Sequence, residues 1–315
     1  MLFEVVALVT AFSVGFAMKR GGLCTYAAVV ELVDEGRTRR MLSFLGAAAW
    51  AGLAVVPLAW LLPGHVMLSA THDVLAVAVL GGLLLGIGAF VNKGCFFGTF
   101  VQLVGGDLNY LATLLGLGGG VMAAHVWLAG ARPATNAPAL AAVPDMAGML
   151  WLAATGLAAV TLLLRAVRGS GAAAAIMLTL GIGGGLLFAT ISGWDFASVL
   201  SQYSFRLLDA GLPSPSKLAI LSTLGMVAGG IWAAVSAGVF RLRGLRLSTL
   251  VLCFSGGALM GGAAYLVPGG NDGMLLKGIP SLAPHALAGY LAMLTAMLAL
   301  QWRVRAAVKR RGGSG

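Results

Sequence analysis

The residues of this chain best suited to chemistry are two cysteines that each lie just after a glycine-containing segment. Cys24 lies in KRGGLCTYAA and Cys95 lies in NKGCFFGTF. A neutral thiol is a weak S–H donor, so it can bind a soft sulfur atom or an oxyanion without a fixed charge. The alternative is packing, because a buried thiol also behaves as a small hydrophobic side chain. These two residues are the first candidates for contact with a solute.

The segments that carry the cysteines belong to an internal repeat. Residues 82–95, GLLLGIGAFVNKGC, align without a gap on residues 257–270, GALMGGAAYLVPGG, so that Cys95 falls on Gly270. A weaker pair joins residues 15–24 to residues 184–193, which places Cys24 opposite Gly193. Such glycines are typical of close helix packing or of turns at membrane depth, where glycine permits a left-handed backbone. Two cysteines at corresponding positions of a repeat favour contact with a solute.

The third cysteine, Cys253 in VLCFSGG, lies well before the glycine pair of its own repeat and is expected to pack. No cysteine pair has CxxC or zinc-site spacing, which indicates neither a disulfide framework nor a metal site. The sequence contains no Walker motif, HExxH, GxSxG or DNA-reading motif. We therefore expect no enzyme, no cofactor and no nucleic-acid partner.

Polar residues beside the repeat glycines are further candidates. Lys93 could attract an anion toward the turn or anchor the chain at the membrane surface. Asn271 and Asp272 could contact a solute or cap a short helix. Asp107 and Asp195 are expected to be caps or loop acids rather than proton carriers. The predicted solute-binding residues are Cys24, Cys95, Lys93, Gly94, Gly22, Gly193, Gly269, Gly270 and Asn271.

The elements that position these residues follow from composition. Hydrophobic residues make up 59% of the chain and charged residues only 10%, which is typical of a polytopic membrane protein. A helix needs about 20 residues to cross a hydrocarbon core of about 30 Å. The long apolar stretches therefore predict nine spans, at 2–18, 40–62, 73–91, 108–130, 146–165, 172–191, 216–239, 247–267 and 284–303.

The basic residues of this chain lie at the ends of apolar segments and report topology. If the N-terminus is outside, sixteen basic residues fall inside and four fall outside. The inside set is Lys19, Arg20, Arg37, Arg39, Arg40, Lys93, Arg165, Arg168, Arg241, Arg243, Arg246, Arg303, Arg305, Lys309, Arg310 and Arg311, and the outside set is Arg132, Arg206, Lys217 and Lys277. This bias predicts a bacterial inner-membrane protein with its N-terminus outside and its C-terminus in the cytoplasm. The first segment is expected to be a retained span rather than a signal peptide.

The repeat and the topology together predict an all-α fold of two inverted halves. We assign residues 1–130 to the first half, 131–171 to a linking span, 172–309 to the second half and 310–315 to a disordered tail. The linking span inverts the second half, so four re-entrant glycine-rich hairpins meet near the middle. Short helices are expected after the turns, at 25–33, 96–104, 194–202 and 271–276. Their unpaired amides would form an anion site.

Three segments resemble the signature loops of a known family. GGLCTYAAV, KGCFFGTFVQLVGGDLNYL and GGALMGGAAYLVPGGNDGMLLKGIPSL are similar to those of the YeeE/YedE family, which includes thiosulfate importers of bacterial inner membranes. The resemblance implies inverted halves with re-entrant hairpins, and thiols that pass thiosulfate along a central path by S–H hydrogen bonds. That role falls on Cys24 and Cys95. The importers also have a thiol in the C-terminal half, where this chain has Gly270, so another sulfur- or selenium-containing anion stays open.

Three functions therefore remain open from the sequence. The first is an inner-membrane transporter that takes up thiosulfate or a related sulfur-containing anion, passed along by cysteine thiols and hairpin backbone amides. The second is a channel or carrier for an unrelated small solute. The third is a membrane partner that relays sulfur to a soluble sulfurtransferase. The expected partners are a small sulfur-containing anion, the lipid bilayer and a cytoplasmic sulfurtransferase.

The charge bias yields a testable topology. Residues 63–72 and 192–215 should face the outside, whereas residues 37–40, residues 165–168 and the C-terminus should face the cytoplasm, because basic loops resist translocation. Single cysteines introduced at these places and labelled with a membrane-impermeant reagent measure this directly. A C-terminus labelled from outside would contradict both the orientation and the assignment of inverted halves.

Overall fold

The computed structural model describes residues 2–72, 75–128, 135–140, 143–208 and 214–312. Within these ranges, nine helical segments are long and apolar enough to cross a membrane, which confirms the predicted all-α fold of nine spans. The boundary predicted near residue 130, the outside residue Arg132 and residues 313–315 of the predicted tail lie outside the described residues. The last helix continues to Gly312.

The described chain is a succession of helices with one small strand pair. In chain order they are α1 (Leu2–Gly21), α2 (Thr25–Val30) with a π-helical turn (Glu31–Glu35), α3 (Arg39–Leu61), α4 (Leu75–Val91), α5 (Phe96–Leu103), a 3-10 turn (Leu108–Tyr110), α6 (Leu111–Trp127), α7 (Met146–Gly169), α8 (Gly171–Leu178) with a π-helical turn (Thr179–Gly184), α9 (Gly185–Thr190), α10 (Phe196–Leu208), α11 (Lys217–Ser236), α12 (Leu247–Leu266), α13 (Gly270–Gly273) with a π-helical turn (Met274–Gly278), and α14 (Pro284–Gly312). Strands β1 (Ala70–His72) and β2 (Thr135–Pro138) pair antiparallel.

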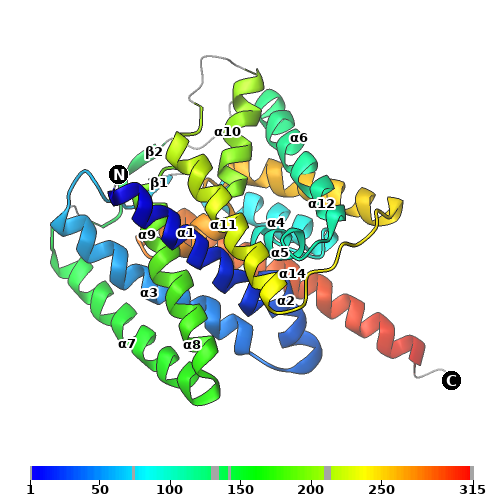
Figure 1. The fold of residues 1–315 in the computed structure, drawn as a ribbon, viewed down its shortest axis with the longest axis horizontal. Helices are drawn as coiled ribbons and strands as arrows, with labels where there is room; N and C mark the ends of the chain where they lie inside the picture. Colours follow the sequence, from blue (N-terminus) through cyan, green and yellow to red (C-terminus); the bar gives the residue numbers. More distant parts are fainter. Residues whose placement is uncertain (1, 73–74, 129–134, 141–142, 209–213, 313–315) are drawn as a thin grey trace.

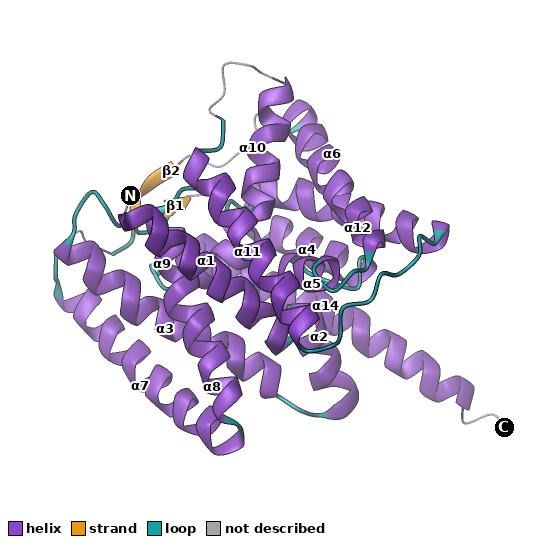
Figure 2. Cartoon of the chain, viewed as in Figure 1, coloured by secondary structure: helices purple, strands orange, loops and turns teal. Residues whose placement is uncertain are grey.

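The two ends of the molecule differ. The N-terminus and the β1–β2 ribbon lie at one end, and the C-terminal end of α14 projects from the opposite end (Figure 1). We call these ends the N-terminal face and the C-terminal face. Apart from the small ribbon, the described chain is a bundle of helices joined by loops (Figure 2).

Helix packing follows the same pattern in both halves. Helix α1 packs against α11, and the counterpart of α1, which is the segment α8 to α9, packs against α3. Likewise α4 packs against α14, while its counterpart α12 packs against α6. Helices α4 and α12, which are counterparts in the repeat, also pack against each other, so the two halves meet along this pair. Helix α7, the linking span, packs against α3. This is the pairing expected of an inverted repeat.

The repeat glycines within the spans let these helix pairs approach closely. A Cβ on Gly82 of α4 would collide with the carbonyl oxygen of Gly289 on α14. Its counterpart Gly257 of α12 would collide with the carbonyl oxygen of Thr113 on α6. For these glycines the packing interpretation is therefore correct, and backbone-to-backbone contact holds the spans together.

Four breaks interrupt helical geometry where the sequence predicts hairpin turns. The non-helical residues are 22–24, 92–95, 191–195 and 267–269. Helices α2 and α5 begin at the predicted residues and α13 begins one residue early. Helix α10 begins at Phe196, two residues later than predicted, because Asp195 caps it. The predicted turns are confirmed in all four places.

Two adjacent glycines of α6 test the close packing. Gly120→Ala should destabilise the protein by about 1–3 kcal/mol, because the new methyl group would overlap the carbonyl oxygen of Ala258 in a tightly packed contact. Gly119→Ala is the matched control, since Gly119 is exposed and a Cβ there would meet no described atom within 4 Å. Thermal unfolding in detergent should show a lower Tm for the first variant only. Equal Tm values would contradict the packing.

Candidate functional site

The two candidate thiols meet at the centre of the bundle although they come from different breaks. The sulfur atoms of Cys24 and Cys95 lie 3.9 Å apart. The backbone amide of Thr25 donates a hydrogen bond to Cys95 Sγ at 3.2 Å. Only 7% of Cys24 and 0% of Cys95 is exposed, so this pair is closed to solvent. Both cysteines occupy the N-cap positions of short helices, α2 and α5.

A buried amide side chain shapes the turn that carries Cys95. Asn92 Nδ2 donates to the carbonyl oxygen of Gly94 at 2.6 Å and to Thr99 Oγ1 at 3.0 Å. Thr113 Oγ1 on α6 donates to Asn92 Oδ1 at 2.7 Å. The side chain therefore pairs polar groups within the turn and fixes the turn to α6. Sequence reasoning missed Asn92. The available signal was that Asn92, the first residue of NKGC, is a polar residue directly after a long apolar stretch.

Space for the Cys24 thiol depends on a glycine in α5. A Cβ at Gly98 would overlap Cys24 Sγ. Gly98 lies in the FFGTF segment, where nothing in the linear sequence shows that a residue from a different break reaches it. Only the three-dimensional arrangement identifies this glycine as part of the thiol site.

Asn271 joins the two halves beside the thiols. Its Oδ1 accepts a hydrogen bond from the backbone amide of Phe96 at 3.1 Å, which pairs one of the free amides at the start of α5. Its Nδ2 has no hydrogen-bond partner among the described residues, and the residue is 0% exposed. Asn271 therefore places the start of α13 directly against the residue that follows Cys95.

The four breaks share one backbone pattern. At or next to each break lies a residue with a left-handed backbone that is followed two residues later by a reactive or titratable side chain. The pairs are Gly22 (φ +56°) with Cys24, Lys93 (φ +55°) with Cys95, Gly193 (φ +62°) with Asp195, and Gly270 (φ +56°) with Asp272; Gly269 (φ +100°) is left-handed as well. The first half therefore contributes two thiols and the second half two carboxyl groups. The gapless sequence alignment matches the ends of the spans, Gly21 with Thr190 and Val91 with Leu266.

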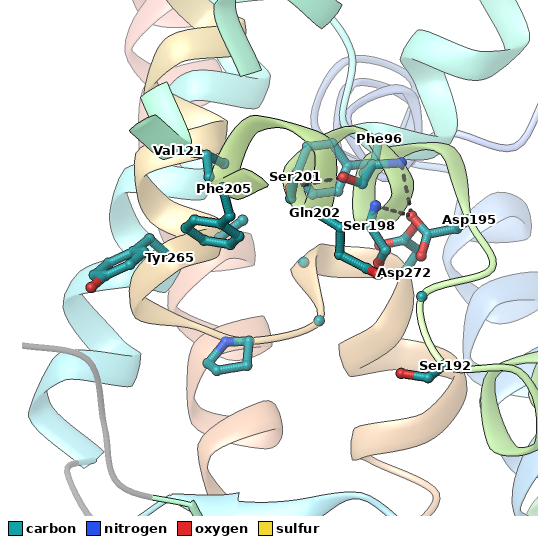
Figure 3. A pocket seen from close by; sticks show the side chains of 16 residues that line it. Phe96, Val121, Ser192, Asp195, Ser198, Ser201, Gln202, Phe205, Tyr265 and Asp272 are labelled. Carbon is teal, nitrogen blue, oxygen red and sulfur yellow. Dashed lines mark hydrogen bonds between the residues drawn. The ribbon is translucent and has the colours of Figure 1, made fainter. Parts of the chain in front are cut away.

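Two cavities open between the breaks of the second half, toward the N-terminal face. Cavity A has a volume of about 320 Å³, and cavity B, which borders β1, has a volume of about 290 Å³. Both are lined by Gly193 and Gly269. Polar residues lining cavity A include Asp195, Ser198, Ser201, Gln202 and Asp272 (Figure 3), and cavity B adds Ser69, His72, Lys277 and His285.

A third cavity, cavity C, lies toward the C-terminal face and has a volume of about 530 Å³. It is lined by Arg20, Leu23, Glu31, Glu35, Arg37, Arg39 and Arg40, among others. Two of the arginines form ion pairs, Arg40 with Glu31 at 3.3 Å and Arg37 with Glu35 at 3.1 Å. Its four arginines outnumber its two glutamates, so the cavity carries a net positive charge.

The thiol pair lies between the cavities. Phe96, the neighbour of Cys95, lines cavity A, and Leu23, the neighbour of Cys24, lines cavity C. Neither thiol lines cavity A, B or C as the described residues define them. The thiol pair is therefore flanked by one residue that lines cavity A and one that lines cavity C.

The remaining predicted residues occupy different environments. Lys93 is exposed and Gly94 is buried, and within the described chain neither lines cavity A, B or C. Cys253 is 2% exposed and packs with Tyr110 and Ala112 in a cluster separate from the one that contains the other two cysteines. This environment matches the packing role expected for Cys253.

Both acids that were expected to cap helices do so. Asp107 accepts a hydrogen bond from the amide of Asn109 at 3.2 Å. One oxygen of Asp195 accepts from the amides of Ala197 at 2.9 Å and Ser198 at 3.0 Å. Over the described ranges, no group of His, Cys, Asp and Glu gathers that could hold a metal ion.

A comparison with protein families agrees with the repeat. A family model described as sulphur transport matches residues 20–177 and again residues 166–299. The two matches meet near the linking span, so each half resembles the same family unit. No curated protein matches the chain significantly.

The contact between the halves can be tested at Asn271. Asn271→Leu leaves the buried amide of Phe96 without its acceptor, which should cost about 1–3 kcal/mol of stability and displace the turn beside Cys95. The matched control is Asn136→Leu in β2, outside the breaks. In thermal unfolding in detergent, Asn271→Leu should have a lower Tm than Asn136→Leu. If both variants unfold at the same temperature, Asn271 does not stabilise the centre.

Proposed function

The chain belongs to the sulphur-transport family, also called YeeE/YedE, and is a multi-pass membrane protein that transports a sulfur compound; from that premise we propose that its substrate is thiosulfate or a closely related sulfur-containing anion. We further propose that the N-terminal face lies outside the bacterial inner membrane, so that transport is uptake into the cytoplasm. The excess of basic residues on the predicted cytoplasmic side supports this orientation.

The observation that carries the proposal is the thiol pair between cavities A and C. The Cys24 and Cys95 sulfur atoms, 3.9 Å apart, are close enough to contact one small anion in succession. A thiol donates a weak hydrogen bond and its sulfur is polarisable, so it suits the terminal sulfur of thiosulfate as well as its oxygens. Because the thiols are neutral, they bind the anion without the strong attraction that would trap it.

Charge and backbone donors support the direction of the path. The positive cavity C would attract an anion leaving the thiols toward the cytoplasm. The free Nδ2 of Asn271 is a neutral donor beside Cys95. Gly193 and Gly269 border both cavities A and B, where their backbone amides could contact the anion. Contact of Gly22, Lys93, Gly94 and Gly270 with the anion stays a prediction.

A cytoplasmic sulfurtransferase stays a predicted partner. The end of α14 at the C-terminal face carries the exposed residues Arg303, Arg305, Lys309 and Arg310, of which Arg305 donates a hydrogen bond to the carbonyl oxygen of Val33. This basic surface would suit an acidic region of a soluble protein that receives the imported sulfur compound. For the other two functions, a carrier of an unrelated solute and a persulfide relay, we identify no supporting contact.

The thiol mechanism predicts different effects for two buried cysteines. Cys95→Ala should lower uptake at least about tenfold, because the passing anion loses a hydrogen-bond donor and the polarisable sulfur at the centre of the path. Cys253→Ala, the matched control, should leave uptake nearly unchanged, since that thiol packs in a separate cluster. Labelled thiosulfate uptake in cells that lack other sulfate and thiosulfate importers measures both.

The amount of folded protein must be compared for both variants by size-exclusion chromatography. Retained uptake in Cys95→Ala would reduce this residue to a packing role. Transport of chloride or a neutral solute at rates equal to thiosulfate would contradict the proposed substrate class.

A further inference from the structure

Two carboxyl groups of the second half lie at its breaks, as the two thiols lie at the breaks of the first half. Asp195 and Asp272 each follow a left-handed glycine by two residues, as Cys24 and Cys95 follow Gly22 and Lys93. Asp195 directly precedes α10 as Cys24 precedes α2, whereas Asp272 lies within the short helix α13. The path proposed above therefore has two thiols contributed by one half and two carboxyl groups by the other.

The two carboxyl groups are buried together. Asp195 is 3% exposed and Asp272 is 5% exposed, and both line cavity A (Figure 3). Both also line a small cavity of about 10 Å³ beyond it, deeper among aromatic side chains. They interact electrostatically with each other, and Asp272 also interacts with Cys95. The carboxyl pair therefore borders cavity A on the side of Cys95.

The hydrogen bonds of Asp195 and Asp272 leave acceptor capacity unused. One oxygen of Asp195 caps α10, and the other, Oδ2, is buried without a hydrogen-bond partner among the described residues. One oxygen of Asp272 accepts from the amide of Gly273 at 3.1 Å. Neither carboxyl forms an ion pair with any residue that the structure describes. The free Nδ2 of Asn271 is a second buried polar group without a partner in this region.

Several titratable groups lie near Asp195 and Asp272. They are Cys95 in the turn before α5, Tyr265 of α12, His125 of α6 in contact with the Tyr265 ring, and His72, Lys277 and His285 lining cavity B. Two adjacent carboxylates in such a place repel each other and lose most of their hydration, and a bound proton relieves both costs. Two ionised carboxylates would also repel an incoming anion.

We propose that Asp195 and Asp272 bind protons from cavity A and that the anion passes only while this pair is protonated, so that uptake is coupled to protons. The inference rests on the proposed function, because it concerns the same path. Protons move from outside water to carboxylate oxygens and are released on the cytoplasmic side with the anion, without a redox step. A protonated carboxyl is also a neutral hydrogen-bond donor, which makes it equivalent in kind to the thiols.

The coupling is measured with the full-length protein in sealed lipid vesicles. The membrane potential is clamped, and the pH outside the vesicles is set one unit below the pH of the lumen. This gradient should raise the steady-state accumulation of labelled thiosulfate about tenfold for each coupled proton. A proton ionophore should abolish this increase. A sodium gradient at equal pH should have no effect. Wild-type accumulation that ignores the pH gradient, or follows the sodium gradient, would overturn the proposal.

Substitutions assign the coupling to the pair. In Asp195→Asn and Asp272→Asn, accumulation should no longer respond to the pH gradient, and asparagine at 195 preserves the helix cap. The matched control is Asp145→Asn: Asp145 caps α7 through the amide of Gly148 at 2.8 Å but does not line cavity A as described. The control should keep the full response. A gradient response preserved in both pair variants would overturn the assignment.

A second readout requires no transport. Infrared difference spectra of the protein between acidic and neutral pH should show a protonated-carboxyl C=O band that is lost or altered in either pair variant and kept in Asp145→Asn. Absence of pair-dependent bands would overturn the inference even if thiosulfate is transported. Conversely, if the pair-dependent bands are present but thiosulfate is not taken up under any gradient, proton binding by the pair is supported and the proposed substrate is contradicted.

Discussion

Every break in a membrane helix exposes backbone amides that lipid cannot pair, and the centre of this protein is organised around that constraint. An unpaired amide in hydrocarbon costs several kcal/mol, so a break persists only where protein supplies partners. Asn271 accepts from Phe96, Asp195 accepts from Ala197 and Ser198, and Cys95 Sγ accepts from Thr25. The residues proposed to contact the anion are therefore the same residues that make the breaks stable.

The two halves pair the amides of their breaks with different chemistry. Cys95 Sγ accepts from the amide of Thr25, whereas the carboxyl groups of Asp195 and Asp272 accept from amides of α10 and α13. Thiols are neutral without assistance, whereas carboxyl groups become neutral only by binding a proton. On the proposed path, both kinds would therefore act as neutral donors, but only the carboxyl groups would require a proton.

The sequence predicted the spans, the four breaks and the importance of Cys24 and Cys95, because hydropathy and glycine repeats report these features directly. It also placed the ends of the spans, because the gapless alignment matches Gly21 with Thr190 and Val91 with Leu266. It did not show which residues within the breaks are left-handed, because a sequence does not display backbone torsions. Gly98 was missed for a related reason: its constraint comes from Cys24, on a different break.

The way the molecule is held together also indicates where a transport movement must occur. The spans contact one another through glycines pressed against carbonyl groups, and such packing resists sliding. Leu23, which lines cavity C, and Phe96, which lines cavity A, flank the thiols. Beside them, Phe97, Phe188 and Trp194 line a cavity of about 10 Å³, which has room for about one water molecule. If the anion takes the path proposed above, the turns and short helices must therefore move, while the glycine-packed spans keep the thiols and carboxyl groups in place.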